Sequence, residues 1–126
     1  MPTVHLDTNI LIGVGDPNSA LRAELQRWLS QGLIVGVSAM AWSEFRCGPA
    51  SPELIEAWRS LLEGRITPIN QALAELAAAL FNQTGRRSRS LPDCLIAATA
   101  IGAGAKLATL NHNDFEPFVK LGLVLL

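Results

Sequence analysis

Apolar segments of two different lengths alternate along the chain, and this alternation restricts the fold more than any other feature. The runs at residues 3–6 and 33–37 have the length of strands, whereas the segment at residues 92–101 is apolar on every side of a helix. A helix without a polar face belongs in a protein interior, and strands that alternate with helices form parallel sheets. The pattern therefore predicts one α/β domain over residues 1–126.

Cap and turn residues bound the expected elements. Strands are predicted at residues 3–6, 33–37, 66–69, 106–110 and 122–126, the third of them weakened by Pro68. Helices are predicted at residues 8–12, 17–28, 38–48, 52–62, 71–82 and 92–101. The expected architecture is a central parallel sheet of four to five strands flanked by helices.

Four acidic residues stand where these apolar elements begin, end or face inward: Asp7, Glu44, Asp93 and Asp114. Ligand sites of parallel sheets lie beyond the carboxyl ends of the strands, so we expect the four side chains to gather there. Carboxylates that converge at the edge of a core need a cation among them, or some must stay protonated. Oxygen ligands suit Mg²⁺ or Mn²⁺, and the pattern therefore favours a site for one or two such ions.

Taken alone, most of these acids have a simpler explanation. Asp7 can cap the following helix, Asp93 suits the positive end of a helix dipole, and Asp114 can belong to a polar turn. Glu44 is harder to explain, because it projects from an apolar helical face where an unpaired glutamate is rarely tolerated. The coincidence of all four favours the metal site.

The charge balance favours a nucleic-acid partner. The chain has 10 basic and 11 acidic residues, so a metal site that uses four acids would leave a mildly basic surface. Arg86, Arg87 and Arg89 crowd into one segment with phosphate-binding chemistry, although such clusters are often only solvated loops. Hydrophobic residues make up 49% of the chain and the mean hydropathy is +0.28, so some apolar surface is expected to meet a partner.

Features of other protein classes are missing from the sequence. The two cysteines are too few for a disulfide framework, and the start of the chain lacks the long apolar stretch of a secretory signal. No apolar run approaches the roughly 20 residues that span a bilayer. His5 and His112 lack the spacing of metal ligands and are expected in a strand and a loop. The sequence predicts a cytoplasmic protein without membrane contact.

Four segments together resemble the PIN-domain ribonucleases, and among them the VapC-type toxins of type II (VapBC) toxin-antitoxin systems. The segments are Leu-Asp-Thr-Asn-Ile-Leu at residues 6–11, Glu44 in its helix, Asp93 before Leu-Ile-Ala-Ala, and residues 109–115. The resemblance spans the chain and implies a PIN-like three-layer sandwich that hydrolyses RNA with one or two Mg²⁺ or Mn²⁺ ions. It implies that Asp7, Glu44, Asp93 and Asp114 are the catalytic, metal-binding quartet.

The same resemblance implies partners. These are an RNA substrate, a small cognate antitoxin that neutralises the toxin, a second copy in a homodimer, and DNA reached indirectly through the antitoxin. Hydroxyl and amide groups near the acids are expected to orient the carboxylates, or else to act only as caps and turn formers: Thr8, Asn9, Thr109 and Asn111. The arginine cluster, which is not part of the family signature, is expected to contact RNA phosphate.

Two other functions remain open from the sequence. A phosphatase of the haloacid dehalogenase type also begins with an aspartate after an early strand, but it generally needs a second aspartate where this chain has Asn9. A catalytically silent binding module would act through exposed aromatic residues, for which the candidates are Trp42, Phe45 and Trp58, although a stripe of such residues is most often plain core.

Overall fold

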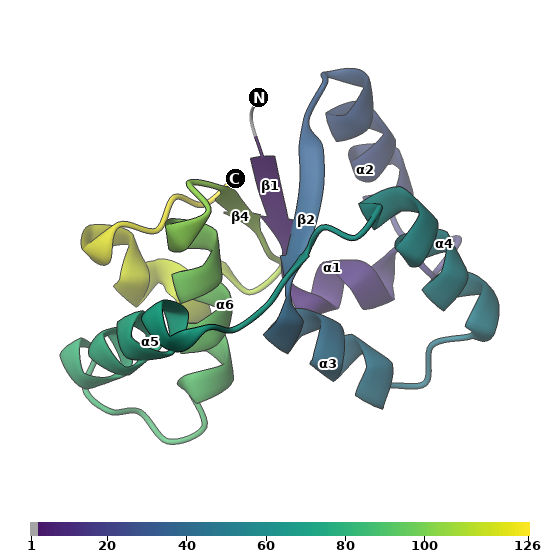
Figure 1. The fold of residues 1–126 in the computed structure, drawn as a ribbon. Helices are drawn as coiled ribbons and strands as arrows, with labels where there is room; N and C mark the ends of the chain where they lie inside the picture. The colour runs from purple at the N-terminus through teal and green to yellow at the C-terminus, as the bar shows by residue number, and fades with distance from the viewer. Residues whose placement is uncertain (1–2) are drawn as a thin grey trace.

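A four-stranded parallel sheet with helices on both sides forms the centre of the protein (Figure 1). The computed structural model describes residues 3–126. The expectation that the chain starts without a secretory signal also concerns Met1 and Pro2, which lie outside the described residues. Figure 1 shows α2 (Leu21–Ser30) and α4 (Pro52–Leu62) on one side of the sheet. On the other side lie α5 (Gln71–Gln83) and α6 (Leu91–Gly102). The predicted layered α/β architecture is confirmed.

The first strand of the chain lies in the middle of the sheet. The strand order is β3-β2-β1-β4, and all neighbours are parallel. The strands are β1 (Thr3–Leu6), β2 (Ile34–Ser38), β3 (Ile66–Thr67) and β4 (Lys106–Ala108). The residue that follows β1 is therefore flanked by the carboxyl ends of β2 and β4, which is the usual place for a ligand site.

The remaining helices collect at the carboxyl ends of the strands. They are α1 (Thr8–Gly13), α3 (Ala39–Cys47), the short α7 (His112–Phe115) and the 3-10 helix η1 (Glu116–Leu121). Side-chain caps define several helix starts, because Ser38, Ser51 and Asn70 each accept a hydrogen bond from a backbone N–H three residues ahead. None of the helices within residues 3–126 combines the length and apolar character needed to cross a membrane.

The helix expected to be central is buried. Cys94 and residues 96–100 of α6 are inaccessible to solvent, and α5 packs along this helix. His5 of β1 is also buried, at 4% exposure, and this burial lowers the pKa of its imidazole. The ring fits because its strand neighbour is Gly36, where a Cβ atom would lie 3.3 Å from Nε2. His112 is exposed at the start of α7.

The structure corrects several expected boundaries. β3 has two residues instead of the four predicted, since Pro68 removes a backbone donor. β4 ends at Ala108 because the next two residues bond to the start of α1 instead of a strand neighbour. The strand expected at residues 122–126 is reduced to one parallel bridge between Leu125 and Leu107. η1 was not anticipated, and α2 begins at Leu21 instead of residue 17.

Candidate metal centre

Asp7 is the fixed point of the candidate site. It directly follows β1, caps α1 and is only 5% exposed. Its Oδ1 accepts a hydrogen bond from the backbone N–H of Thr8 at 2.8 Å, and its Oδ2 accepts one from the hydroxyl of Thr109 at 2.7 Å. Both carboxylate oxygens are therefore held in place by partners from two segments that are about a hundred residues apart.

Burial and neighbouring charge act together on Asp7. Burial raises the pKa of its carboxyl, and the negative charges of Glu44 and Asp114 raise it further. The hydrogen bonds from Thr109 and Thr8 oppose this rise, because they stabilise the ionised form. The effect of Glu44 and Asp114 on this pKa shows that both carboxylates lie in the same electrostatic neighbourhood as Asp7.

Glu44 projects from α3 toward the start of α1. The side chain is half-buried, and its Oε1 accepts a hydrogen bond from the hydroxyl of Thr8 at 2.7 Å. Thr8 thus joins two of the acids, since its backbone binds Asp7 while its side chain binds Glu44. The hydrogen bond from Thr8 therefore stabilises the inward orientation of the Glu44 side chain.

Asp93 stands in the first turn of α6 and is half-buried. Burial is the largest cause that raises the pKa of its carboxyl to about 6, and the negative charges of Asp7, Asp114 and Glu44 add to the rise. Arg87 is the opposing positive charge. Asp114 lies on α7, is exposed, and borders a surface hollow formed by residues 110–114. We call these four residues the acidic cluster.

The carboxylates of the acidic cluster are close enough for their charges to act on one another, but as placed they do not form a coordination shell. Within residues 3–126, no three His, Cys, Asp or Glu side chains stand close enough together to hold a metal ion as they are placed. Two carboxylates at 4 Å repel by about 1 to 4 kcal/mol, and hydroxyl partners hold Asp7 and Glu44 where they are. The all-oxygen donor set fits Mg²⁺ or Mn²⁺.

The groups expected to orient the carboxylates fall into two kinds. Thr8 and Thr109 touch carboxylates directly, as described above. Asn9 instead accepts a hydrogen bond through Oδ1 from the backbone N–H of Leu110 at 3.3 Å, which ties α1 to the segment after β4. Asn111 contributes its backbone N–H, which donates to the Thr109 hydroxyl at 3.0 Å, while its side chain is exposed.

The three arginines of the α5–α6 loop are separated by the structure. All three are exposed, and Arg87 is the one whose positive charge opposes the rise in the pKa of Asp93. Arg86 donates through Nε to Oδ1 of Asn82. The structure therefore brings one arginine of the predicted set, and not the set as a whole, to the acidic cluster.

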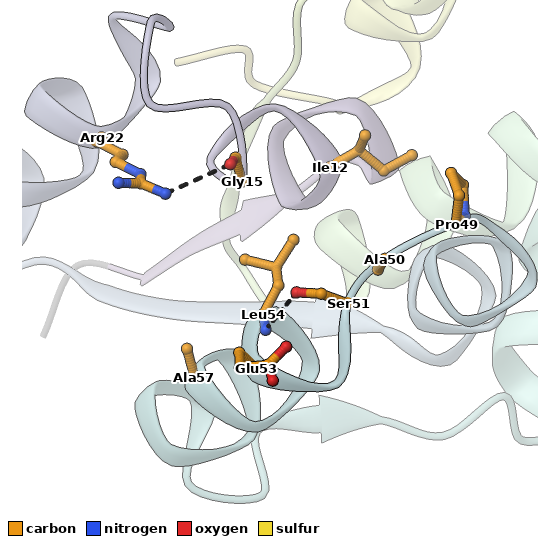
Figure 2. A pocket seen from close by; sticks show the side chains of 9 residues that line it. All are labelled: Ile12, Gly15, Arg22, Pro49, Ala50, Ser51, Glu53, Leu54 and Ala57. Carbon is orange, nitrogen blue, oxygen red and sulfur yellow. Dashed lines mark hydrogen bonds between the residues drawn. The ribbon is translucent and has the colours of Figure 1, made fainter.

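A hollow of about 490 Å³ lies away from the acidic cluster, beside the end of α1 and the start of α4. We call it the apolar groove; its lining is Ile12, Gly15, Arg22, Pro49, Ala50, Ser51, Glu53, Leu54 and Ala57 (Figure 2). Figure 2 shows Leu54 projecting from α4 toward the end of α1, where a Cβ atom on Gly15 would come within 2.7 Å of it. Ile12 is 46% exposed at the rim.

The sequence did not indicate this groove, and the aromatic residues named as possible contact groups belong to the core or pack against it, which was the alternative reading of them. Phe45 and Trp58 are buried, and Trp42 is half-buried against Phe45 with ring centroids 5.4 Å apart. Trp58 donates its indole N–H to the backbone oxygen of Leu11 at 3.0 Å, so it joins α4 to α1. Aliphatic residues on short helices, such as Ile12, could have indicated the groove, but their exposure is known only from the structure.

Comparison with known proteins places these features in a family. Residues 4–119 match the family described as PIN domain. A stretch of 90 residues is 34% identical to "Ribonuclease VapC10" of Mycobacterium tuberculosis and covers 69% of this chain and 67% of that protein.

Solved structures agree with this match. The structure of VapBC2 from Rickettsia felis, bound to a promoter DNA fragment, is similar with a TM-score of 0.79 and 19% identity over 98% of this chain and 97% of that one. A toxin-antitoxin complex from Klebsiella pneumoniae gives a TM-score of 0.71 and 29% identity over 89% of both chains. With the acidic cluster at the carboxyl end of a four-stranded parallel sheet, the chain belongs to the PIN domain family and is related within it to the VapC proteins.

Proposed function

We propose that this PIN domain is an endoribonuclease that hydrolyses RNA phosphodiester bonds with one or two Mg²⁺ or Mn²⁺ ions. The observation that carries the proposal is Asp7, a buried carboxylate fixed by Thr109 at the end of the central strand and surrounded by three more acids. The name of the relative, Ribonuclease VapC10, supports RNA as the substrate.

The residues of the acidic cluster have separate tasks in this proposal. Asp7 and Glu44 offer oxygens that hydroxyl groups already orient. The carboxyl group of Asp93 has a pKa of about 6, and it would bind a cation in its deprotonated form. Asp114 is the most exposed acid and borders the hollow through which a phosphate can approach. When bound, the cation offsets charge that develops on the phosphate and lowers the pKa of the attacking water.

The direct test is cleavage of single-stranded RNA by the purified protein, freed of any copurifying partner. Cleavage is expected with Mg²⁺ or Mn²⁺ and should disappear with a chelator. Asp7→Asn should abolish it, whereas Asp16→Asn should not, because Asp16 is an exposed loop residue that accepts a local hydrogen bond from Asn18. Cleavage that persists without divalent ions would refute the metal-dependent mechanism.

The two alternative functions that the sequence left open are supported to different degrees. Membership of the PIN domain family and the engagement of Asn9 with the backbone of Leu110 leave the haloacid dehalogenase type phosphatase without support. A catalytically silent binding module keeps one supporting observation, the apolar groove. A protein that binds a partner tightly but cleaves no RNA under any metal condition would establish that alternative.

We further propose that the protein is the toxin of a type II toxin-antitoxin pair. Two structural neighbours are described as VapBC and toxin-antitoxin complexes, one of them bound to promoter DNA. The apolar groove would receive an apolar segment of the small antitoxin, which would also cover the acidic cluster and carry any contact with DNA. Coexpression with a short reading frame found next to the gene and encoding a small protein should relieve growth arrest caused by this chain, and growth arrest that no such partner relieves would contradict the proposal.

A homodimer and a cytoplasmic location are further predictions that accompany this role. Several large aliphatic side chains are exposed outside the apolar groove: Leu29, Ile69, Leu91, Leu110, Val119, Val124 and Leu126. Such side chains suit contact with another chain. Light scattering on the purified protein should give twice the 13.5 kDa mass of the chain.

A further inference from the structure

The loop between α5 and α6 has a fixed conformation that gives Arg87 a defined direction. Arg86 and Arg89, which flank it, both have left-handed backbone angles, with φ of 53° and 67°, a region that residues other than glycine seldom enter. The backbone oxygen of Arg87 accepts hydrogen bonds from both the N–H and the hydroxyl of Ser90, at 3.1 and 2.7 Å. The loop is therefore anchored to the start of the helix that carries Asp93.

Arg87 also has a side-chain environment that the other two arginines lack. Its guanidinium carbon lies 6.0 Å from the centre of the Phe118 ring, so an aromatic face of η1 supports the cation. Arg86 is engaged with Asn82 at 3.1 Å. Among the described residues, no acceptor takes a hydrogen bond from the guanidinium of Arg87, and none of the ion pairs involves it. Its N–H donors are thus unpaired within residues 3–126, while the Phe118 ring lies beside its guanidinium.

Arg87 lies beside one member of the acidic cluster. The hydrogen bonds from Ser90 to its backbone oxygen hold it at the start of α6, whose first turn carries Asp93. It nevertheless makes no ion pair with a carboxylate of the described chain. A cation that is next to an acid of the cluster but unpaired is available to a phosphate.

We infer that Arg87 is the residue that binds an RNA phosphate beside the acidic cluster, with Phe118 supporting its guanidinium, and that it gives the site its attraction for RNA. The inference rests on the proposed function. Two divalent cations would only neutralise the four carboxylates, so a net positive charge facing the substrate depends on Arg87. The planar guanidinium can bind two phosphate oxygens at once, which a lysine ammonium does less well.

Salt-dependent binding tests this inference without cleavage. In an Asp7→Asn background, the affinity for a single-stranded RNA oligonucleotide is measured between low and high salt in the presence of Mg²⁺. Adding Arg87→Ala should weaken binding about tenfold and reduce the slope of log affinity against log salt by about 0.7, the value of one lost phosphate contact. Arg87→Lys should keep the slope but lose part of the affinity.

Controls separate this role from two others. Arg27→Ala removes an exposed arginine that pairs with Glu24 on α2, and it should leave affinity and slope unchanged. If Arg87 only offsets the carboxylates, Arg87→Ala would change the pH profile of cleavage and leave the RNA slope intact, which would overturn the inference. Arg87→Gln, which removes the charge but keeps a polar side chain with an aliphatic stem, serves if the alanine variant has a lowered melting temperature.

Failure of this inference is distinguishable from failure of the proposed function. Wild-type protein that cleaves RNA with a divalent ion, combined with an unchanged salt slope for Arg87→Ala and Arg87→Gln, refutes the role of Arg87 alone. Wild-type protein that neither cleaves nor binds RNA refutes both.

Discussion

The acidic cluster and the apolar groove are two candidate functional regions built in opposite ways. In the cluster, polar groups are buried and tied together, as when Thr109 holds Asp7 at the end of β1. In the groove, aliphatic side chains such as Ile12 stay exposed between α1 and α4. Under the proposed function, the cluster would bind an ion through carboxylates held by hydroxyl groups, whereas the groove would bind a protein partner through side chains left uncovered.

The largest expected effect concerns a charge of the acidic cluster. Glu44→Gln keeps an acceptor for the Thr8 hydroxyl but removes a carboxylate. Loss of a residue that only hydrogen-bonds to a metal ligand lowers activity by up to about 100-fold, and the loss of RNA cleavage in Glu44→Gln should be larger. Cleavage assays at saturating Mn²⁺ measure this. Glu75→Gln on the exposed side of α5 is the matched control and should retain full activity.

The apolar groove should respond in the opposite sense. Ile12→Asp places a charge where an apolar segment would be buried, so affinity for the antitoxin should fall by about 100-fold while RNA cleavage is kept. Titration of the antitoxin into a cleavage assay measures both quantities. Val124→Asp, an equally exposed aliphatic position outside the groove, should still be inhibited. Loss of cleavage in Ile12→Asp would mean that the two regions are not independent.

Removing one hydrogen bond should have an intermediate effect. Thr109→Val preserves shape but removes the hydroxyl that donates to Asp7 and accepts from the backbone of Asn111, so metal affinity or cleavage should drop about 10- to 100-fold. Thr109→Ser restores the hydroxyl and should recover most of the activity. Equal losses in both variants would show that packing, not the hydrogen bond, matters at this position.

The smallest expected effect is on stability as a function of pH. The pKa of Asp93 is raised to about 6 in the folded protein from its ordinary value of 3.8, so the folded state binds more protons than the unfolded state between these values. Stability from this residue is therefore present at low pH and lost as the pH rises through about 6. In the presence of a chelator, the stabilisation by Asp93→Asn should grow across this window and then level off. A pH-independent difference in melting temperature would contradict this.

Residues whose position follows from the sheet topology could be predicted from the sequence. Asp7 ends a strand and Asp93 begins an apolar helix, and parallel strands bring such positions to one edge, as the structure shows. Thr109 was expected near the site for the same reason. What the sequence could not give is which hydroxyl meets which carboxylate, because that depends on how far β4 continues.

Surface properties were less predictable because they depend on packing between distant elements. Trp58 and Phe45 looked like contact residues, yet both are covered by neighbours that local sequence does not reveal. Arg86, Arg87 and Arg89 looked equivalent, and only the fold of their loop separates Arg87 from the others. The groove required the end of α1 and the start of α4 to be placed together.

The central position of β1 has a consequence for synthesis of the protein. Among the four strands, β1 is made first, yet it pairs with β4, whose residues 106–108 are made much later, and the threonine that holds Asp7 follows them directly. A nascent chain thus carries Asp7 and Glu44 long before the residues that complete the acidic cluster have been made. Under the proposed function, the chain would be unable to cleave its own message until nearly all of the domain has been made.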